Sequence, residues 1–150
     1  MSLSAREVAV GLLSRRDHSV KELRQKLAQR SFAANEIDEA IAHCEHYGWL
    51  NDARVAEMLL RHGISKGHGL SRIRQDCQRK GISASLTDQA TESLEFDWYE
   101  HAREIATRKF GVLGELTKAK DPKEHAKRMR YLQYRGFDFD QIRYALNPED

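Results

Sequence analysis

The chain has 150 residues, of which 40% are hydrophobic and 32% charged, and its 25 basic and 23 acidic side chains leave a formal net charge of +2. This composition excludes a mostly disordered tail, and no stretch approaches the roughly 20 apolar residues that a membrane span needs. Charged residues interrupt the first residues before any apolar block, so we expect no signal peptide and a cytosolic location.

Apolar residues recur at helical spacing from the N-terminus onward. Ala5 to Leu13 places its apolar side chains on one face of a first helix. Ser19 and Glu22 have the spacing of a capping box, which predicts the start of a second helix. A third helix is expected near Asn35, and Gly48 suits its left-handed end.

The same pattern continues to the C-terminus. Six further helices are expected: one capped by Asn51 or Asp52 that buries Ala53, Ala56, Leu59 and Leu60; one from Leu70 to Gly81; one capped by Ser83 or Ser85 and ending near Glu95; one from Asp97 to Gly111; one from a cap at Asp121 to Arg135; and one from Asp138 to before Pro148. Only Pro122 and Pro148 interrupt the chain, and strand-like runs are missing, so the sequence predicts an all-helical protein.

Three hexamers share one pattern: apolar, two variable, basic, small, apolar. They are residues 27–32 (LAQRSF), 77–82 (CQRKGI) and 132–137 (LQYRGF), which start 50 and then 55 residues apart. Each ends the second helix of a group of three. A period near 50 residues built from three helices predicts a tandem array, in which each repeat buries apolar surface against the next.

Charge alternates along the chain with the same period. Residues 1–33, 61–80 and 102–135 carry net charges of +4, +5 and +6, whereas residues 34–60, 81–101 and 136–150 carry −5, −5 and −3. If equivalent helices face the same way, the basic blocks form a long positive stripe suited to a phosphate backbone or to an extended acidic partner. The alternative is a set of solvated helix faces with local ion pairs.

Several segments resemble a known family. Residues 16–27 (RDHSVKELRQKL) are similar to the opening motif of the RecX regulatory proteins, and residues 48–54 (GWLNDAR) are similar to their second motif. Residues 66–82, 108–111 and 132–137 continue the similarity in order, over nearly the whole chain. The resemblance implies an all-α fold, an elongated, curved array of three tandem three-helix repeats, which we place at residues 1–50, 51–96 and 97–150. Cys77 stands where the family usually has leucine, so looser packing is expected there.

The resemblance also implies a function. RecX proteins bind the filament of the RecA recombinase on DNA and restrain its ATP hydrolysis, strand exchange and coprotease activity, so a role in DNA repair, recombination and the SOS response is expected. We expect a cytosolic monomer without a cofactor that contacts RecA and the backbone of single- and double-stranded DNA. The residues predicted to bind DNA or the filament are Arg24, Lys26, Lys66, Arg72, Arg74, Arg79, Lys80, Lys127, Arg128 and Arg130.

Two other functions stay open. The chain could be a free-standing helical module that binds DNA without sequence preference and without a recombinase, or an adaptor that binds only protein. Steeply salt-dependent binding to bare DNA would count against the adaptor. Sequence-specific recognition is not expected, because no motif places a base-reading helix in a known groove geometry.

Catalytic and metal sites are not expected. His43 and His46 flank Cys44 without a convincing fourth ligand, and Asp17, His18 and Ser19 are adjacent in sequence, which excludes the geometry of a hydrolytic triad. Cys44 and Cys77 are interpreted as small buried hydrophobic residues. Most of the larger aromatic residues are expected in the core, with Tyr134 as the best candidate for an exposed one. The group is Trp49, Trp98, Tyr99, Phe110, Tyr131, Tyr134 and Phe137.

Overall fold

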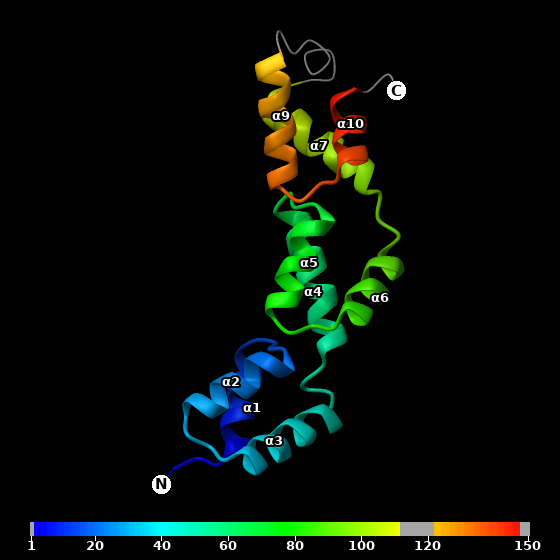
Figure 1. The fold of residues 1–150 in the computed structure, drawn as a ribbon. Helices are drawn as coiled ribbons and strands as arrows, with labels where there is room; N and C mark the ends of the chain where they lie inside the picture. The colour runs from blue at the N-terminus through cyan, green and yellow to red at the C-terminus, as the bar shows by residue number, and fades with distance from the viewer. Residues whose placement is uncertain (1, 112–121, 148–150) are drawn as a thin grey trace. The chain divides into compact units, whose positions relative to one another are not determined.

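A computed structural model describes residues 2–111 and 122–147, and all regular structure within these ranges is helical (Figure 1). The helices are α1 (Ala5–Arg15), α2 (Val20–Gln29), α3 (Ala34–His46), α4 (Asp52–Ser65), α5 (Leu70–Arg79), α6 (Ala84–Leu94), α7 (Trp98–Phe110), α9 (Pro122–Tyr134) and α10 (Phe139–Leu146). The prediction of an all-α fold is confirmed. Among the described residues, none of these helices combines the length and the apolar character that crossing a bilayer requires.

Side-chain caps define the starts of most helices, as predicted. The Ser19 hydroxyl accepts a hydrogen bond from the Glu22 backbone N–H at 3.1 Å, and Glu22 accepts one from the Ser19 N–H at 3.1 Å. Asp138 forms the same capping box at the start of α10. Asn51, Ser83 and Asp97 cap α4, α6 and α7. The predicted cap at Asp121 and the stop at Pro148 lie outside the described residues.

The three matching hexamers are the C-terminal caps of α2, α5 and α9. In each one the N–H of the last residue donates to the C=O of the first: Phe32 to Leu27 at 3.4 Å, Ile82 to Cys77 at 3.0 Å and Phe137 to Leu132 at 3.2 Å. The small fifth residue has a positive φ, 67° at Ser31, 77° at Gly81 and 103° at Gly136. This geometry is the Schellman motif, whose first and last residues are apolar because they pack together.

Two of the three caps also contact the preceding repeat. A Cβ placed on Gly81 would lie 2.6 Å from the Cβ of Lys21, in the first turn of α2. A Cβ on Gly136 would lie 2.6 Å from the Cβ and 2.7 Å from the backbone N of Arg72, in the first turn of α5. Both positions therefore need glycine for two reasons, the backbone conformation and the lack of space. Ser31, at the equivalent position of the first repeat, is exposed.

At the same junctions, backbone N–H groups at helix starts, which have no partner within their own helix, find hydrogen-bond acceptors. The N–H groups of Gly69 and Ser71 donate to the carbonyls of Arg135 and Gly136, at 2.7 and 3.1 Å. In the first repeat, the Val20 N–H donates to the Asp52 carboxylate at 2.9 Å. Since the first N–H groups of a helix have no partner inside it, these bonds fix the starts of α2 and α5 to the repeat that follows each of them.

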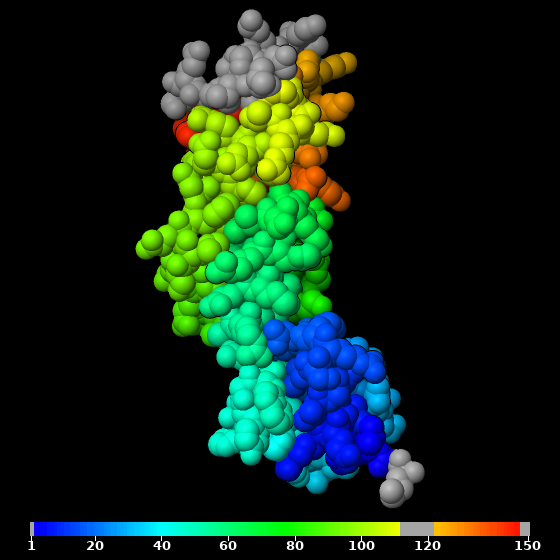
Figure 2. All heavy atoms as spheres, turned by 180° about the vertical axis from the view of Figure 1, so that it is seen from behind, coloured from blue at the N-terminus to red at the C-terminus, as the bar shows by residue number. Residues whose placement is uncertain are grey.

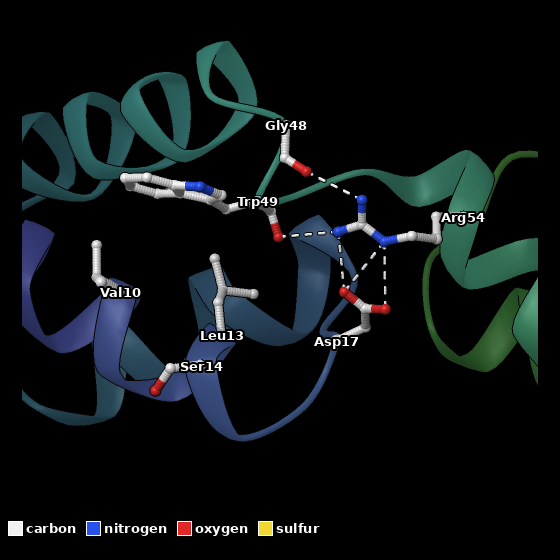
Figure 3. A pocket seen from close by; sticks show the side chains of 7 residues that line it. All are labelled: Val10, Leu13, Ser14, Asp17, Gly48, Trp49 and Arg54. Atoms are coloured by element: carbon white, nitrogen blue, oxygen red, sulfur yellow. Dashed lines mark hydrogen bonds and ion pairs between the residues drawn. The ribbon is translucent and has the colours of Figure 1, made fainter.

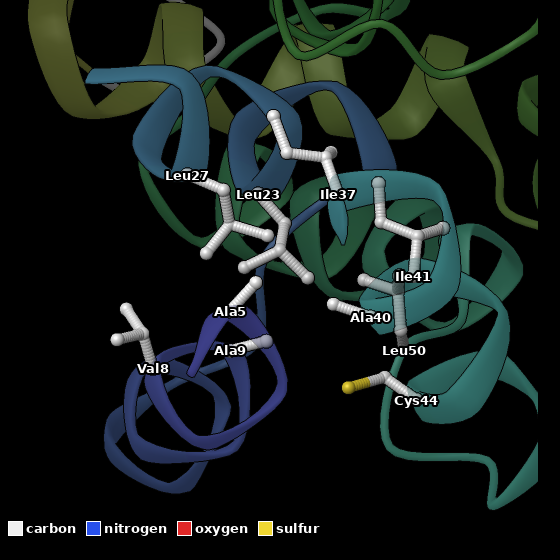
Figure 4. Close-up of a cluster of buried hydrophobic side chains, with 10 residues drawn as sticks. All are labelled: Ala5, Val8, Ala9, Leu23, Leu27, Ile37, Ala40, Ile41, Cys44 and Leu50. Atoms are coloured by element: carbon white, nitrogen blue, oxygen red, sulfur yellow. The ribbon is translucent and has the colours of Figure 1, made fainter. Parts of the chain in front are cut away.

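The chain divides into two compact units. One comprises residues 1–58 with 77–90, and the other comprises the described parts of 59–76 and 91–150. The core of the first unit lies between α1, α2 and α3 and contains ten buried residues, among them Leu23, Leu27 and Cys44 (Figure 4). The core of the second unit lies between α7, α9 and α10, around Leu132 and Phe137. Cys44 and Cys77 are both buried, as interpreted from the sequence, and neither forms a disulfide with a described residue.

Three predictions of burial are wrong. Ala53 is exposed, and Val55 takes its place on the buried face of α4. Trp49 is 44% exposed because Leu50 enters the core and leaves the indole stacked on Tyr47 at the surface, with ring centres 4.9 Å apart. Tyr99 is 43% exposed, and its ring packs edge-on against Tyr144. Tyr134, the expected exception, is 84% exposed.

We predict that Gly136→Ala lowers the free energy of unfolding by about 3 kcal/mol, because it adds the cost of a left-handed non-glycine residue to that of an overpacked junction. Gly81→Ala should cost less, since its added methyl meets the side chain of Lys21 rather than backbone. Denaturant unfolding monitored by circular dichroism measures both values.

Ser31→Gly is the matched control. It removes a left-handed non-glycine conformation at a cap whose fifth residue is exposed, so it should stabilise the protein by about 0.5 kcal/mol. Losses at positions 81 and 136 that are equal to each other and no larger than the gain at position 31 would show that the contacts with the preceding repeat add nothing.

Candidate nucleic-acid and filament interface

In the first unit, the predicted binding residues belong to α2 and to the end of α5. Arg24 is exposed and forms an ion pair with Asp38 of α3 at 2.7 Å. Lys26 is half-buried in the last turn of α2, and Arg79 is exposed. Arg6 of α1 forms a further pair with Glu39 of α3 at 2.5 Å. The basic and acidic blocks of the sequence therefore meet in this unit as exposed pairs, each worth about 0–1 kcal/mol.

Lys80 forms a more enclosed ion pair. Its Nζ lies 2.9 Å from Oε2 of Glu22, whose side chain is only 15% exposed, and Arg16 approaches the same oxygen at 3.3 Å. Burial by itself raises the pKa of Glu22, but the hydrogen bonds from Lys80 and the Ser19 N–H, with the charges of Lys80 and Arg16, lower it from 4.5 to about 2. Lys80 thus links α5 to the start of α2, and a phosphate would have to compete with Glu22 for it.

In the second unit, the predicted residues differ in how much surface they offer. Lys66, Arg74, Lys127 and Arg130 are exposed or half-buried, and Arg72 is half-buried beside Gly136. Arg128 is only 7% exposed: its guanidinium pairs with Glu124 at 2.8 Å and lies over the ring of Phe110 at 5.3 Å. This geometry gives Arg128 a packing role and leaves it little surface for a phosphate.

The two opening motifs of the sequence meet in space, which the sequence analysis missed. Arg54 donates to the Asp17 carboxylate through Nη2 at 2.9 Å and through Nε at 3.2 and 3.3 Å, and also to the carbonyls of Gly48 and Trp49 (Figure 3). The guanidinium of Arg54 therefore connects the turn before α4 to the turn before α2 through hydrogen bonds. A cavity of about 370 Å³ lies beside it, with Val10, Leu13 and the Trp49 ring as its apolar wall.

Three histidines are buried in the helical framework. His18 Nδ1 lies 3.1 Å from the carbonyl of Arg16, and His101 Nε2 lies 3.1 Å from the carbonyl of His68. Burial lowers the pKa of all three, which favours neutral rings at physiological pH. Across residues 2–111 and 122–147, no cluster of three or more histidine, cysteine or acidic residues is arranged to hold a metal ion.

We predict that Glu22→Gln destabilises the protein by about 1 kcal/mol at neutral pH, because glutamine keeps the capping box but loses the charge that Lys80 and Arg16 neutralise. The pKa of Glu22 is lowered by folding, so its carboxylate stabilises the protein above pH 4.5, and this contribution disappears as the pH falls toward about 2. When the free energy of unfolding is measured across this pH range, the difference between the variant and the wild type should shrink toward zero.

Glu7→Gln is the matched control, since Glu7 forms the same capping box with Ser4 but has no ion pair with a described residue. Glu7→Gln should lower the free energy of unfolding by less than Glu22→Gln does, and this loss should depend less on pH. A Glu22→Gln loss that persists unchanged at pH 3 would contradict the ion-pair explanation.

Comparison with known proteins matches this architecture. Three family profiles align with the chain in order: RecX, first three-helix domain, with residues 5–44; RecX, second three-helix domain, with residues 51–90; and RecX, third three-helix domain, with residues 95–146. The prediction of three tandem three-helix repeats is thereby confirmed. The boundaries that we placed at residues 50 and 96 stay predictions.

Full-length relatives agree with the profiles. The Regulatory protein RecX of Vibrio parahaemolyticus is 46% identical over 149 residues, which cover 99% of this chain and 94% of the relative. The Regulatory protein RecX of Pasteurella multocida is 39% identical, over 97% and 88%. A crystal structure of RecX from Lactobacillus salivarius has the same fold, with a TM-score of 0.82 at 22% identity over 96% of this chain and 93% of that one. The relatives are named as regulators, in line with the prediction that the chain is not an enzyme. The chain belongs to the RecX family of regulatory proteins.

Proposed function

We propose that this chain binds the filament that RecA forms on DNA and restrains RecA's ATP hydrolysis, strand exchange and coprotease activity. The proposal rests on the similarity of this chain to regulatory RecX proteins, which extends over nearly its full length and through all three repeats. We further propose that it acts in the cytosol as a monomer, in DNA repair, recombination and the SOS response.

Exposed cations support contact with a polyanionic partner. Arg79 and Arg72 lie seven residues apart on α5, two helical turns, and so share a face. Lys127 and Arg130 present a comparable pair on α9. Because lysine and arginine side chains that neutralise phosphates release counterions, such faces bind DNA without reading its sequence. The proposed partners are therefore RecA together with the phosphate backbone of the DNA in the filament.

A free-standing DNA-binding module is the second candidate, favoured by the same exposed cations. It differs from the first in requiring no recombinase. The two functions separate in one assay, because only a filament regulator alters what RecA does on DNA that is already saturated with RecA.

The assay is DNA-dependent ATP hydrolysis by RecA, titrated with this protein. We expect inhibition at substoichiometric amounts, because one molecule bound at a filament end or in its groove affects many RecA subunits. No change in the rate at saturating protein would contradict a role on RecA and leave the DNA-binding module as the better account.

The residues are tested by replacing Arg72, Arg79 and Lys80 together with alanine. We expect affinity for DNA and for the filament to fall about tenfold with helicity unchanged, because the variant removes three cations from one helix and its cap. Lys80→Ala alone serves as the control, since it removes the pair with Glu22 but keeps both arginines. Unchanged affinity of the triple variant would exclude these residues from the site.

A further inference from the structure

A second basic site lies wholly within the second unit, and of its four cations only Lys66 was predicted from the sequence to bind DNA or the filament. It is a cavity of about 210 Å³ where the C-terminal ends of α4, α7 and α9 meet. Lys66, Arg108, Lys109 and Arg135 supply its charge, and Tyr131 and Gly67 form part of its wall. Figure 2 shows the last turns of α7, in yellow, beside the end of α9, in orange, on this face of the molecule.

Among residues 2–111 and 122–147, no acidic side chain balances the charge of this cavity. No aspartate or glutamate of these ranges lines it, and none of its four cations forms an ion pair with a carboxylate of these ranges. Three helix C-termini contribute about −0.5 charge each. These ends offset about 1.5 of the four positive charges and leave roughly 2.5 to attract an anion.

Other contacts hold two of the cations in place before any ligand arrives. The Arg135 Nη1 donates to the Lys66 carbonyl at 2.9 Å. The guanidinium of Arg135 and the Nζ of Lys109 lie 5.3 and 5.2 Å from the centre of the Tyr131 ring, both within range of a cation–π interaction. A Cβ on Gly67 would lie 3.0 Å from Ile105 and 3.5 Å from Arg135 Nη1, so glycine allows this close approach.

We propose that this cavity, defined by Lys66, Arg108, Lys109 and Arg135 around Tyr131, binds phosphate groups of a nucleic-acid strand. Arginine presents a planar set of donors that fits phosphate oxygens, and lysine adds a point charge. A protein carboxylate brings a single negative charge, whereas a strand brings one phosphate per about 3.4 Å of duplex length. Neighbouring phosphates on one strand therefore match the excess charge better. This inference rests on the proposed function, in which the strand is the DNA of the filament.

The test compares two double variants of the full chain. Arg108→Gln with Lys109→Gln removes two charges from the cavity. Arg61→Gln with Arg143→Gln removes the same charge from exposed positions of the same unit outside it. Binding to fluorescein-labelled oligothymidine and to a labelled duplex is measured by anisotropy between about 50 and 200 mM salt, and thermal unfolding verifies that each variant is folded.

We expect the cavity variant to bind at least about tenfold more weakly. Its log–log salt slope for the single strand should fall by about 0.7 for each phosphate that the protein no longer neutralises. The control should bind less than about threefold more weakly, because screening limits the effect of distant charges. Equal weakening of DNA binding in the two variants, or no weakening in the cavity variant, would overturn the proposal of this site. Competition by inorganic pyrophosphate as strong as that by oligothymidine would also overturn it, by making the ligand a small phosphate.

ATP hydrolysis by RecA separates this inference from the proposed function. A wild-type protein that inhibits RecA but binds neither oligonucleotide overturns the phosphate site and leaves the regulatory role intact. A protein that binds DNA through the cavity but leaves RecA unaffected supports the site and contradicts the regulatory role.

Discussion

The architecture depends on how closely the end of one second helix approaches the start of the second helix before it. Gly81 lies against Lys21 and Gly136 against Arg72, at separations that leave no room for a side chain. The basic residue just before each glycine strengthens the same junction: Lys80 pairs with Glu22, and Arg135 donates to the Lys66 carbonyl. The repeated hexamer is thus both a helix cap and a connection between repeats. In the first copy of the hexamer, Arg30 and Ser31 are both exposed.

Ion pairing divides the basic residues into two groups. Arg24, Lys80 and Arg128 each have a carboxylate partner from another helix or from their own, and Arg128 is buried as well. In contrast, Lys66, Arg108, Lys109 and Arg135 gather where three helix ends meet, and no acidic residue is among the described residues that line their cavity. The alternating charge of the sequence therefore has two consequences. Part of it stabilises contacts between helices, and the remainder leaves local positive surface on a chain whose net charge is only +2.

Local signals in the sequence predicted the helices and their caps, because apolar spacing and capping residues act over a few positions. Ser19 with Glu22 is an example in which the predicted residues form the predicted bonds, and Asp138 caps the helix that was predicted to start there. The sites were harder to predict from the sequence, because they depend on which helix ends meet in the fold. Neither the Arg54–Asp17 contact nor the cavity around Tyr131 has a local signature, since their residues are separated by 37 and up to 69 positions. The basic residue shared by the three hexamers pointed to Arg135, but the position of Arg135 in the sequence did not show which residues would lie next to it.

The proposed function requires the chain to bind RecA assembled on DNA more tightly than either component alone. Co-sedimentation of labelled protein with RecA filaments formed on oligothymidine tests it, with free RecA and bare oligothymidine measured in parallel at the same salt concentration. We expect the filament to bind the protein at least about tenfold more tightly than either component does, a difference of about 1.4 kcal/mol. Equal affinity for bare oligothymidine and for the filament would contradict it.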